Sequence, residues 1–147
     1  MNRVLKGVLP VMLLMLFAFT TYVLPVFGHH GFQAEYDGSK VIYITGTLTK
    51  FEWENPHAYF WVDAKDASSG KVTTWVFEGA SPIAVKRTGT VRADFTSNIG
   101  KTVTVRGIPG KDGTTKGAAE TIKLPDGREV VVGGKRFFGE GKGGGEN

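Results

Sequence analysis

A strand–turn–strand pattern in residues 51–63 restricts the fold more than any other feature of the sequence. Two apolar-rich runs flank Asn55-Pro56, a dipeptide that is typical of turns. Because side chains alternate between the two faces of a strand, the second run has one face suited to a core, formed by Ala58, Phe60 and Val62. The opposite face combines a histidine with aromatic and acidic residues: His57, Tyr59, Trp61 and Asp63. We therefore expect a half-buried strand that displays a histidine beside the turn.

Residues 1–28 are typical of a bacterial export signal. Two basic residues precede an apolar run over residues 8–26, and the residues up to Gly28 suit a cleavage site. We predict cleavage after Gly28, which makes His29 the mature N-terminus. The apolar run, at about 20 residues, is also long enough to span a bilayer as an uncleaved anchor, although its prolines disfavour a membrane helix. Both alternatives predict a periplasmic or secreted domain.

The mature chain is long enough for one domain and too short for two. Removing 28 of the 147 residues leaves 119. Two of the 18 Lys and Arg residues lie in the signal, so 16 basic residues remain against 14 acidic ones. This near balance does not predict binding to nucleic acid, or to a membrane after signal cleavage, because both need a dense basic patch. The chain has no cysteine, and its three methionines lie in the signal, which leaves the mature domain no sulfur ligand for a metal.

Strand-like runs and turn signals alternate along the domain, which we place at residues 29–132. Gly46 interrupts the first run, where a glycine often marks a bulge or bend. In a later run, Val103 and Val105 alternate with polar residues, as in a half-buried strand. The predicted strands are residues 40–53, 57–64, 71–78, 101–108, 118–124 and 129–132.

The segments outside these strands carry other signals. Ser81 and Pro82 are typical of the N-cap and first position of a helix, which we expect to end near Thr88. Residues 31–37 are short and mixed in character, which predicts an extended arm. Residues 133–147 include seven glycines and few apolar groups, so we expect a flexible tail.

This chain order predicts a mainly β fold, a small five- to six-stranded OB-like Greek-key barrel with one short helix between strands 3 and 4. A generic β-sandwich or another small barrel remains the alternative, because spacing does not fix strand pairing. In OB-like barrels, the loop between strands 1 and 2 lines the usual binding face. Here that loop is residues 54–57, which end at His57.

Several short motifs follow one another along the mature chain. They are His29-His30-Gly31-Phe32, Gly46-Thr47, Trp53-Glu54-Asn55-Pro56-His57, Trp75-Val76-Phe77-Glu78, Ser81-Pro82, residues 100–107, Lys111-Asp112-Gly113 and residues 124–128. In these motifs the chain resembles a family of small exported bacterial proteins catalogued as a domain of unknown function (6152). The resemblance implies export and a compact β domain, and it implies no activity, because the family has none assigned. Members often have a tryptophan soon after the helix, where this chain has Gly89-Thr90-Val91, so that link is expected to differ.

The three histidines are the candidate metal ligands. A free N-terminal His29 offers its α-amine and imidazole, and His30 adds a deprotonatable amide and a second imidazole. With His57 they form a nitrogen-rich set that suits copper, nickel or zinc, among which copper(II) has the highest intrinsic affinity. We therefore predict a metal-binding protein without turnover, with copper favoured. The acidic residues that could orient His57 from outside the ligand set are Glu54, Asp63 and Glu78.

A simpler interpretation involves no metal. The two terminal histidines then form a disordered end, and His57 caps the strand turn. Glu54 and Asp63 would be solvated charges, and Glu78 would accept hydrogen bonds from backbone amides at the start of the helix. The protein would then be an interaction or self-assembly module that uses a sheet edge or an aromatic face. The candidates for that face are Trp53, Tyr59 and Trp61.

Enzymatic activity is not expected from either interpretation. No serine lies in a nucleophile-elbow pattern, and the glycine clusters lack a phosphate-binding fingerprint.

Overall fold

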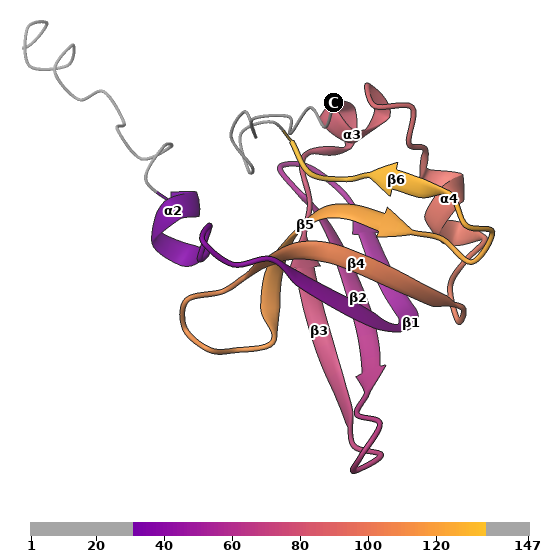
Figure 1. The fold of residues 1–147 in the computed structure, drawn as a ribbon. Helices are drawn as coiled ribbons and strands as arrows, with labels where there is room; N and C mark the ends of the chain where they lie inside the picture. Colours follow the sequence, from indigo (N-terminus) through magenta and orange to yellow (C-terminus); the bar gives the residue numbers. More distant parts are fainter. Residues whose placement is uncertain (1–30, 135–147) are drawn as a thin grey trace, which may run out of the picture. The chain divides into compact units, whose positions relative to one another are not determined.

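The structure, a computed structural model, describes residues 31–134 (Figure 1). The predicted signal peptide, His29, His30 and residues 135–147 of the predicted tail lie outside the described residues.

Six strands and three short helices make up the described part of the chain. The strands are β1 (Ile42–Trp53), β2 (Ala58–Lys65), β3 (Val72–Glu78), β4 (Thr102–Pro109), β5 (Lys116–Lys123) and β6 (Glu129–Val131). The helices are α2 (Gly31–Glu35), α3 (Pro82–Lys86) and α4 (Arg92–Thr96). All six predicted strands are therefore present, with ends that differ by at most two residues.

The strands form a closed five-strand barrel with one additional strand. Their order is β3-β2-β1-β4-β5-β6, with antiparallel neighbours, and a parallel pairing between β3 and β5 closes the barrel (Figure 1). β6 pairs with β5 outside the closed set. The mainly β, OB-like Greek-key barrel expected from the sequence is confirmed.

The long strand β1 bends so that it serves both sides of the barrel. Its first half pairs with β4 and its second half pairs with β2. A Cβ atom at Gly46 would lie 2.3 Å from the carbonyl oxygen of Asp63 and 2.9 Å from the Cα of Ala64. Only glycine allows this approach of two backbones. The irregular register expected near Gly46 lies slightly further along, between Leu48 and Lys50.

The core of the barrel is formed by the side chains that the apolar–polar alternation along β2 and β4 predicts to face inward. Ala58, Phe60 and Val62 are fully buried, and so is Val105. The ring of Phe95, from α4, lies 4.7 Å from the ring of Phe60 and closes one end of the core. Burial of each large apolar side chain contributes about 1.5–3 kcal/mol to folding.

The prediction of one helix between strands 3 and 4 is wrong, because two helices occur there. Ser81 caps α3 as expected, since its Oγ accepts a hydrogen bond from the Ala84 amide at 3.3 Å. The sequence gives a weaker signal for α4, because its N-cap is Val91, which has no side-chain acceptor. Asp94 supplies the missing acceptor from inside the helix, because its Oδ2 accepts a hydrogen bond from the Val91 amide at 2.8 Å.

The prediction of an extended arm at residues 31–37 is also wrong over most of this segment, because residues 31–35 form α2. The Tyr36 amide donates to the carbonyl of Phe32 at 2.9 Å, and the two rings lie 4.9 Å apart. Both rings pack against Ile108 and Ala118 in a small apolar cluster. Tertiary packing therefore stabilises a helix that its own sequence only weakly favours.

Within residues 31–134, no helix is both long and apolar enough to cross a membrane.

We predict that Gly46→Ala lowers the free energy of unfolding by about 1–3 kcal/mol, because the added methyl group meets backbone atoms that cannot rotate away. Chemical denaturation of the two proteins measures the difference. Gly38→Ala is the matched control, since a Cβ at Gly38 meets no atom within 4 Å, and it should change stability by less than about 0.5 kcal/mol. Equal stabilities for the two variants would contradict the close approach at Gly46.

Candidate functional site

The carboxylate of Glu78 lies at the centre of the candidate site. Glu78 is the last residue of β3 and pairs with Tyr59 of β2 and Ala118 of β5. Its Oε2 accepts a hydrogen bond from the Tyr36 hydroxyl at 2.9 Å. Its Oε1 lies 3.2 Å from Nδ1 of His57. The carboxylate thus connects the segment after α2 with the loop between β1 and β2. Its contacts are with Tyr36 and His57, whereas the interpretation without a metal predicts hydrogen bonds from backbone amides at the start of α3.

The contacts of His57 determine its tautomer. Nδ1 lies 3.1 Å from the carbonyl oxygen of Gly79 as well as 3.2 Å from the Glu78 carboxylate. A carbonyl oxygen only accepts hydrogen bonds, so Nδ1 carries the proton and donates. In the neutral ring, the lone pair is then on Nε2, the atom suited to bind a metal ion. The side chain of His57 is 33% exposed, so the ring lies at the surface of the barrel.

Backbone contacts bring His57 next to Glu78. The Ala58 amide donates to the carbonyl of Ala80 at 3.1 Å, and the Gly79 amide donates to the carbonyl of Ala58 at 2.8 Å. The loop before β2 contains a cis peptide bond at Asn55-Pro56. These contacts continue the β2–β3 pairing past the end of β3, so the histidine that begins the second run faces the acid that ends the third.

A small hollow of about 160 Å³ lies beside the carboxylate. Burial and the neighbouring charge of Glu78 raise the pKa of Tyr36 well above its usual value. Burial, and then the charge of Glu78, also raise the pKa of Tyr59. Both phenols are therefore held in the neutral, hydrogen-donating form. The residues that line the hollow are Glu35, Tyr36, Tyr59, Val76, Glu78 and Lys116.

The other two acidic candidates are not held on His57 in this way. Asp63 lies six residues further along the same strand, about 20 Å away at the rise of a β-strand. Its Oδ1 accepts a hydrogen bond from the hydroxyl of Thr74 at 2.6 Å. Glu54 is exposed in the loop before β2. Of the three predicted acids, Glu78 is the one whose contact with His57 the structure shows.

The predicted aromatic face is divided between two sides of the sheet. Trp53 lies opposite Ala58 on the core side, and its ring is 5.7 Å from that of Phe95. Its Nε1 is buried and has no hydrogen-bond partner within the described part of the chain. Tyr59 and Trp61 remain on the outer face, 6.2 Å apart, with the ammonium group of Lys50 4.3 Å from the centre of the Trp61 ring. The outer face therefore lacks one of its three predicted members.

Sequence reasoning did not identify Tyr36. It is only 4% exposed, and it contacts an acid 42 positions away in the chain. The residues around it carry no motif that predicts such a distant partner. The only signal was its position, in the short segment between the two terminal histidines and the first strand.

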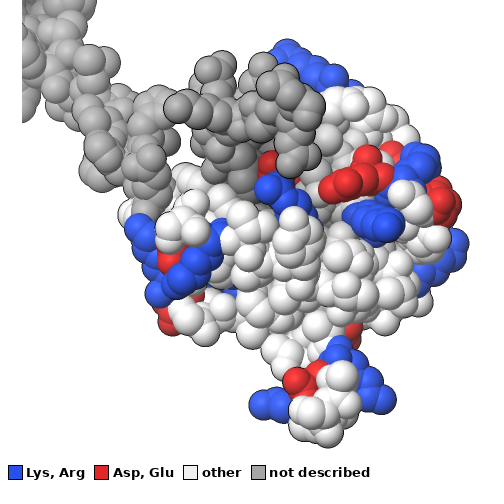
Figure 2. All heavy atoms as spheres, in the orientation of Figure 1, with Lys and Arg blue, Asp and Glu red and all other residues white. Residues whose placement is uncertain are grey.

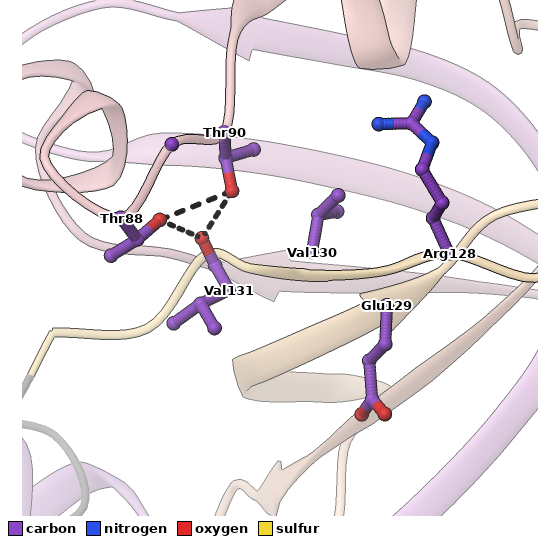
Figure 3. Close-up of a pocket in the computed structure, with 7 residues that line it drawn as sticks. Thr88, Thr90, Arg128, Glu129, Val130 and Val131 are labelled. Atoms are coloured by element: carbon purple, nitrogen blue, oxygen red, sulfur yellow. Dashed lines mark hydrogen bonds between the residues drawn. The ribbon is translucent and has the colours of Figure 1, made fainter.

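A second hollow, of about 300 Å³, lies along β6 (Figure 3). The hydroxyls of Thr88 and Thr90 both donate to the carbonyl of Val131 at 3.0 Å. Arg128 at its rim is paired with Asp94 and Asp126. These polar groups bond to one another, and the two hydroxyls cover a carbonyl of β6, the strand at the edge of the sheet. We therefore interpret the hollow as a structural feature that protects this edge.

Charged side chains of both signs are interspersed over the face drawn in Figure 2, with uncharged surface between them. Within residues 31–134, no group of three or more His, Asp or Glu side chains is arranged to hold a metal ion.

Comparison with known proteins gives one match. A family model described as a family of unknown function (DUF6152) matches residues 18–120, which confirms the resemblance seen in the sequence. No curated protein and no solved structure matches the chain.

We predict that Tyr36 makes stability fall with alkaline pH. An unfolded tyrosine ionises near pH 10, whereas Tyr36 stays protonated in the folded chain. Its contribution is therefore complete below about pH 10 and declines as the pH rises further. The unfolding free energy of Tyr36→Phe should decline less steeply than that of the wild type above pH 10, by up to about 1.4 kcal/mol per pH unit. Urea denaturation at a series of pH values measures both slopes.

Between about pH 7 and pH 9 the stability difference between the two proteins should not change with pH, which is the internal control. Parallel slopes above pH 10 would show that the Tyr36 phenol ionises normally.

Proposed function

Because the chain belongs to the DUF6152 family, whose function is unknown, its role must be inferred from the site, and we propose that it is an exported metal-binding β-barrel. The proposed ligands are His29 and His30 at the mature N-terminus and His57 of the barrel. Copper(II) is the preferred ion, ahead of nickel and zinc, because nitrogen donors bind it most tightly. The protein acts by binding in the periplasm or outside the cell and performs no turnover.

The observation that carries this proposal is the double contact of Glu78. One carboxylate oxygen faces Nδ1 of His57, and the other accepts the hydroxyl of Tyr36. A histidine that binds a metal through one ring nitrogen commonly donates its other N–H to a carboxylate or a carbonyl, which fixes the ring and increases its basicity. His57 has both kinds of acceptor at Nδ1, and this supports Nε2 as the ring nitrogen of the proposed ligand set.

The position of Tyr36 in the chain supports the inclusion of the terminal histidines. Tyr36 is fixed to the carboxylate that faces His57, and it follows His30 by six residues. Six residues span at most about 20 Å when fully extended. The connection from Tyr36 is therefore long enough for His29 and His30 to reach the site, and a short connection lowers the entropy cost of closing a ring of ligands.

We predict that the chain purified after export starts at His29 and binds one copper(II) ion tightly. Intact mass gives the N-terminus, and titration with copper(II) under a competing chelator gives the affinity. One extra residue before His29 should weaken binding at least tenfold, because it removes the α-amine from the ligand set. His57→Ala should have an effect of similar size. Binding should also weaken with acid, because the amine and imidazoles must lose protons to coordinate.

Asp63→Asn is the matched control, since Asp63 lies about 20 Å along the strand from His57 and should leave the affinity unchanged. A chain that is not cleaved before His29, or one whose binding is indifferent to both the extra residue and His57→Ala, would refute the proposed ligand set.

The same material tests the alternative, an interaction or self-assembly module. The observation in its favour is the pair of outer-face rings, Tyr59 and Trp61, with Lys50 over the indole. If the protein forms an oligomer that persists in chelator and is lost in Trp61→Ala, the aromatic face is the functional surface and the metal proposal is displaced.

A further inference from the structure

We infer that metal binding at His57 and docking of residues 31–37 on the barrel are energetically coupled, and that Tyr36 is the positioning residue that couples them. This inference rests on the proposed function, since it concerns the regulation of the same site. It assigns a role to a buried tyrosine that neither the sequence motifs nor the family match identified.

The segment has its own attachment to the barrel, independent of the phenol. The Asp37 amide donates to the carbonyl of Pro109 at 2.9 Å, and the Lys111 amide donates to the carbonyl of Glu35 at 2.9 Å. Tyr36 itself forms an isolated β-bridge with Gly110. These contacts hold residues 35–37 against the link between β4 and β5. Removal of the hydroxyl alone therefore leaves most of the attachment intact.

The hydroxyl of Tyr36 adds the one described contact from this segment to the carboxylate at the site. Glu78 uses one oxygen for Tyr36 and the other for His57, so a single orientation of the carboxylate satisfies both groups. The Tyr36 residue is 4% exposed and the Glu78 side chain 17%, so both groups of this contact are largely buried. Without the phenol, the carboxylate can rotate, and the His57 ring keeps the Gly79 carbonyl but loses the fixed orientation of its second acceptor.

Coupling of this kind acts in both directions. If docking of the segment favours the metal-binding orientation of His57, then bound metal must favour docking by the same factor. Opening of the segment breaks the hydrogen bonds of the Asp37 and Lys111 amides, so hydrogen exchange at these amides reports docking directly.

The test compares copper(II) affinity and amide exchange in the exported wild-type chain, in Tyr36→Phe and in Tyr59→Phe. Tyr59→Phe is the matched control, because it removes the other phenol of the same hollow, whose raised pKa comes from burial and nearby charge without a hydrogen bond. Tyr36→Phe should weaken copper(II) binding about tenfold, and Tyr59→Phe less than twofold. The visible absorption and electron paramagnetic resonance spectra of bound copper(II) should change in Tyr36→Phe only.

In the wild type, saturating copper(II) should slow exchange at the Asp37 and Lys111 amides, and this slowing should be reduced in Tyr36→Phe by about the factor that the substitution costs in affinity. A wild type that binds copper(II) through His57 but shows no slowing, or an unchanged affinity in Tyr36→Phe, overturns the coupling and leaves the proposed function in place. A wild type that binds no metal overturns both.

Discussion

The parallel pairing of β3 with β5 is the constraint on which the rest of the fold depends. It consists of three residue pairs, ending with Glu78 opposite Ala118. The strands approach closely because β5 has a glycine at the middle pair: a Cβ at Gly117 would lie 2.8 Å from the Phe77 ring. This pairing turns an open sheet into a barrel, encloses Phe77, and fixes the end of β3. The candidate site is therefore built at the seam where the barrel closes.

The strands and the core could be predicted because their signals are local. The alternation of Ala58, Phe60 and Val62 with polar and aromatic residues specifies a buried and an outer face, and the structure has them as expected. Val103 and Val105 in β4 follow the same rule. Turn residues between these runs mark where each strand ends, and so they indicate the number of strands. Patterns that repeat every second residue express a single physical requirement, namely one apolar face per strand.

The parts that could not be predicted depend on contacts between distant residues. α4 follows Val91, an N-cap residue with no side-chain acceptor of its own, and its Phe95 is held by the barrel core. The segment at residues 31–35 is helical because the rings of Phe32 and of Tyr36, which follows the helix, pack on Ile108 and Ala118. The site shows the same limit. The alternation pointed to His57, whereas the connection from His57 through Glu78 to Tyr36 exists only in the folded chain.

The peptide group between Gly79 and Ala80 connects the site to the residue after the last strand. Its carbonyl contacts His57, and its amide is held by Val132, which is synthesised much later. The neighbouring Ala80 amide donates to the carbonyl of Val132 at 2.8 Å, and a Cβ at Gly79 would lie 3.1 Å from that same oxygen. A chain of contacts thus runs from Tyr36 through Glu78, His57 and Gly79–Ala80 to Val132, although these residues emerge from the ribosome or the export channel far apart in time. A chain that stops before residue 132 contains every proposed ligand and lacks the carbonyl that holds the Gly79–Ala80 peptide, which His57 contacts. Completion of the site therefore reports completion of the whole domain.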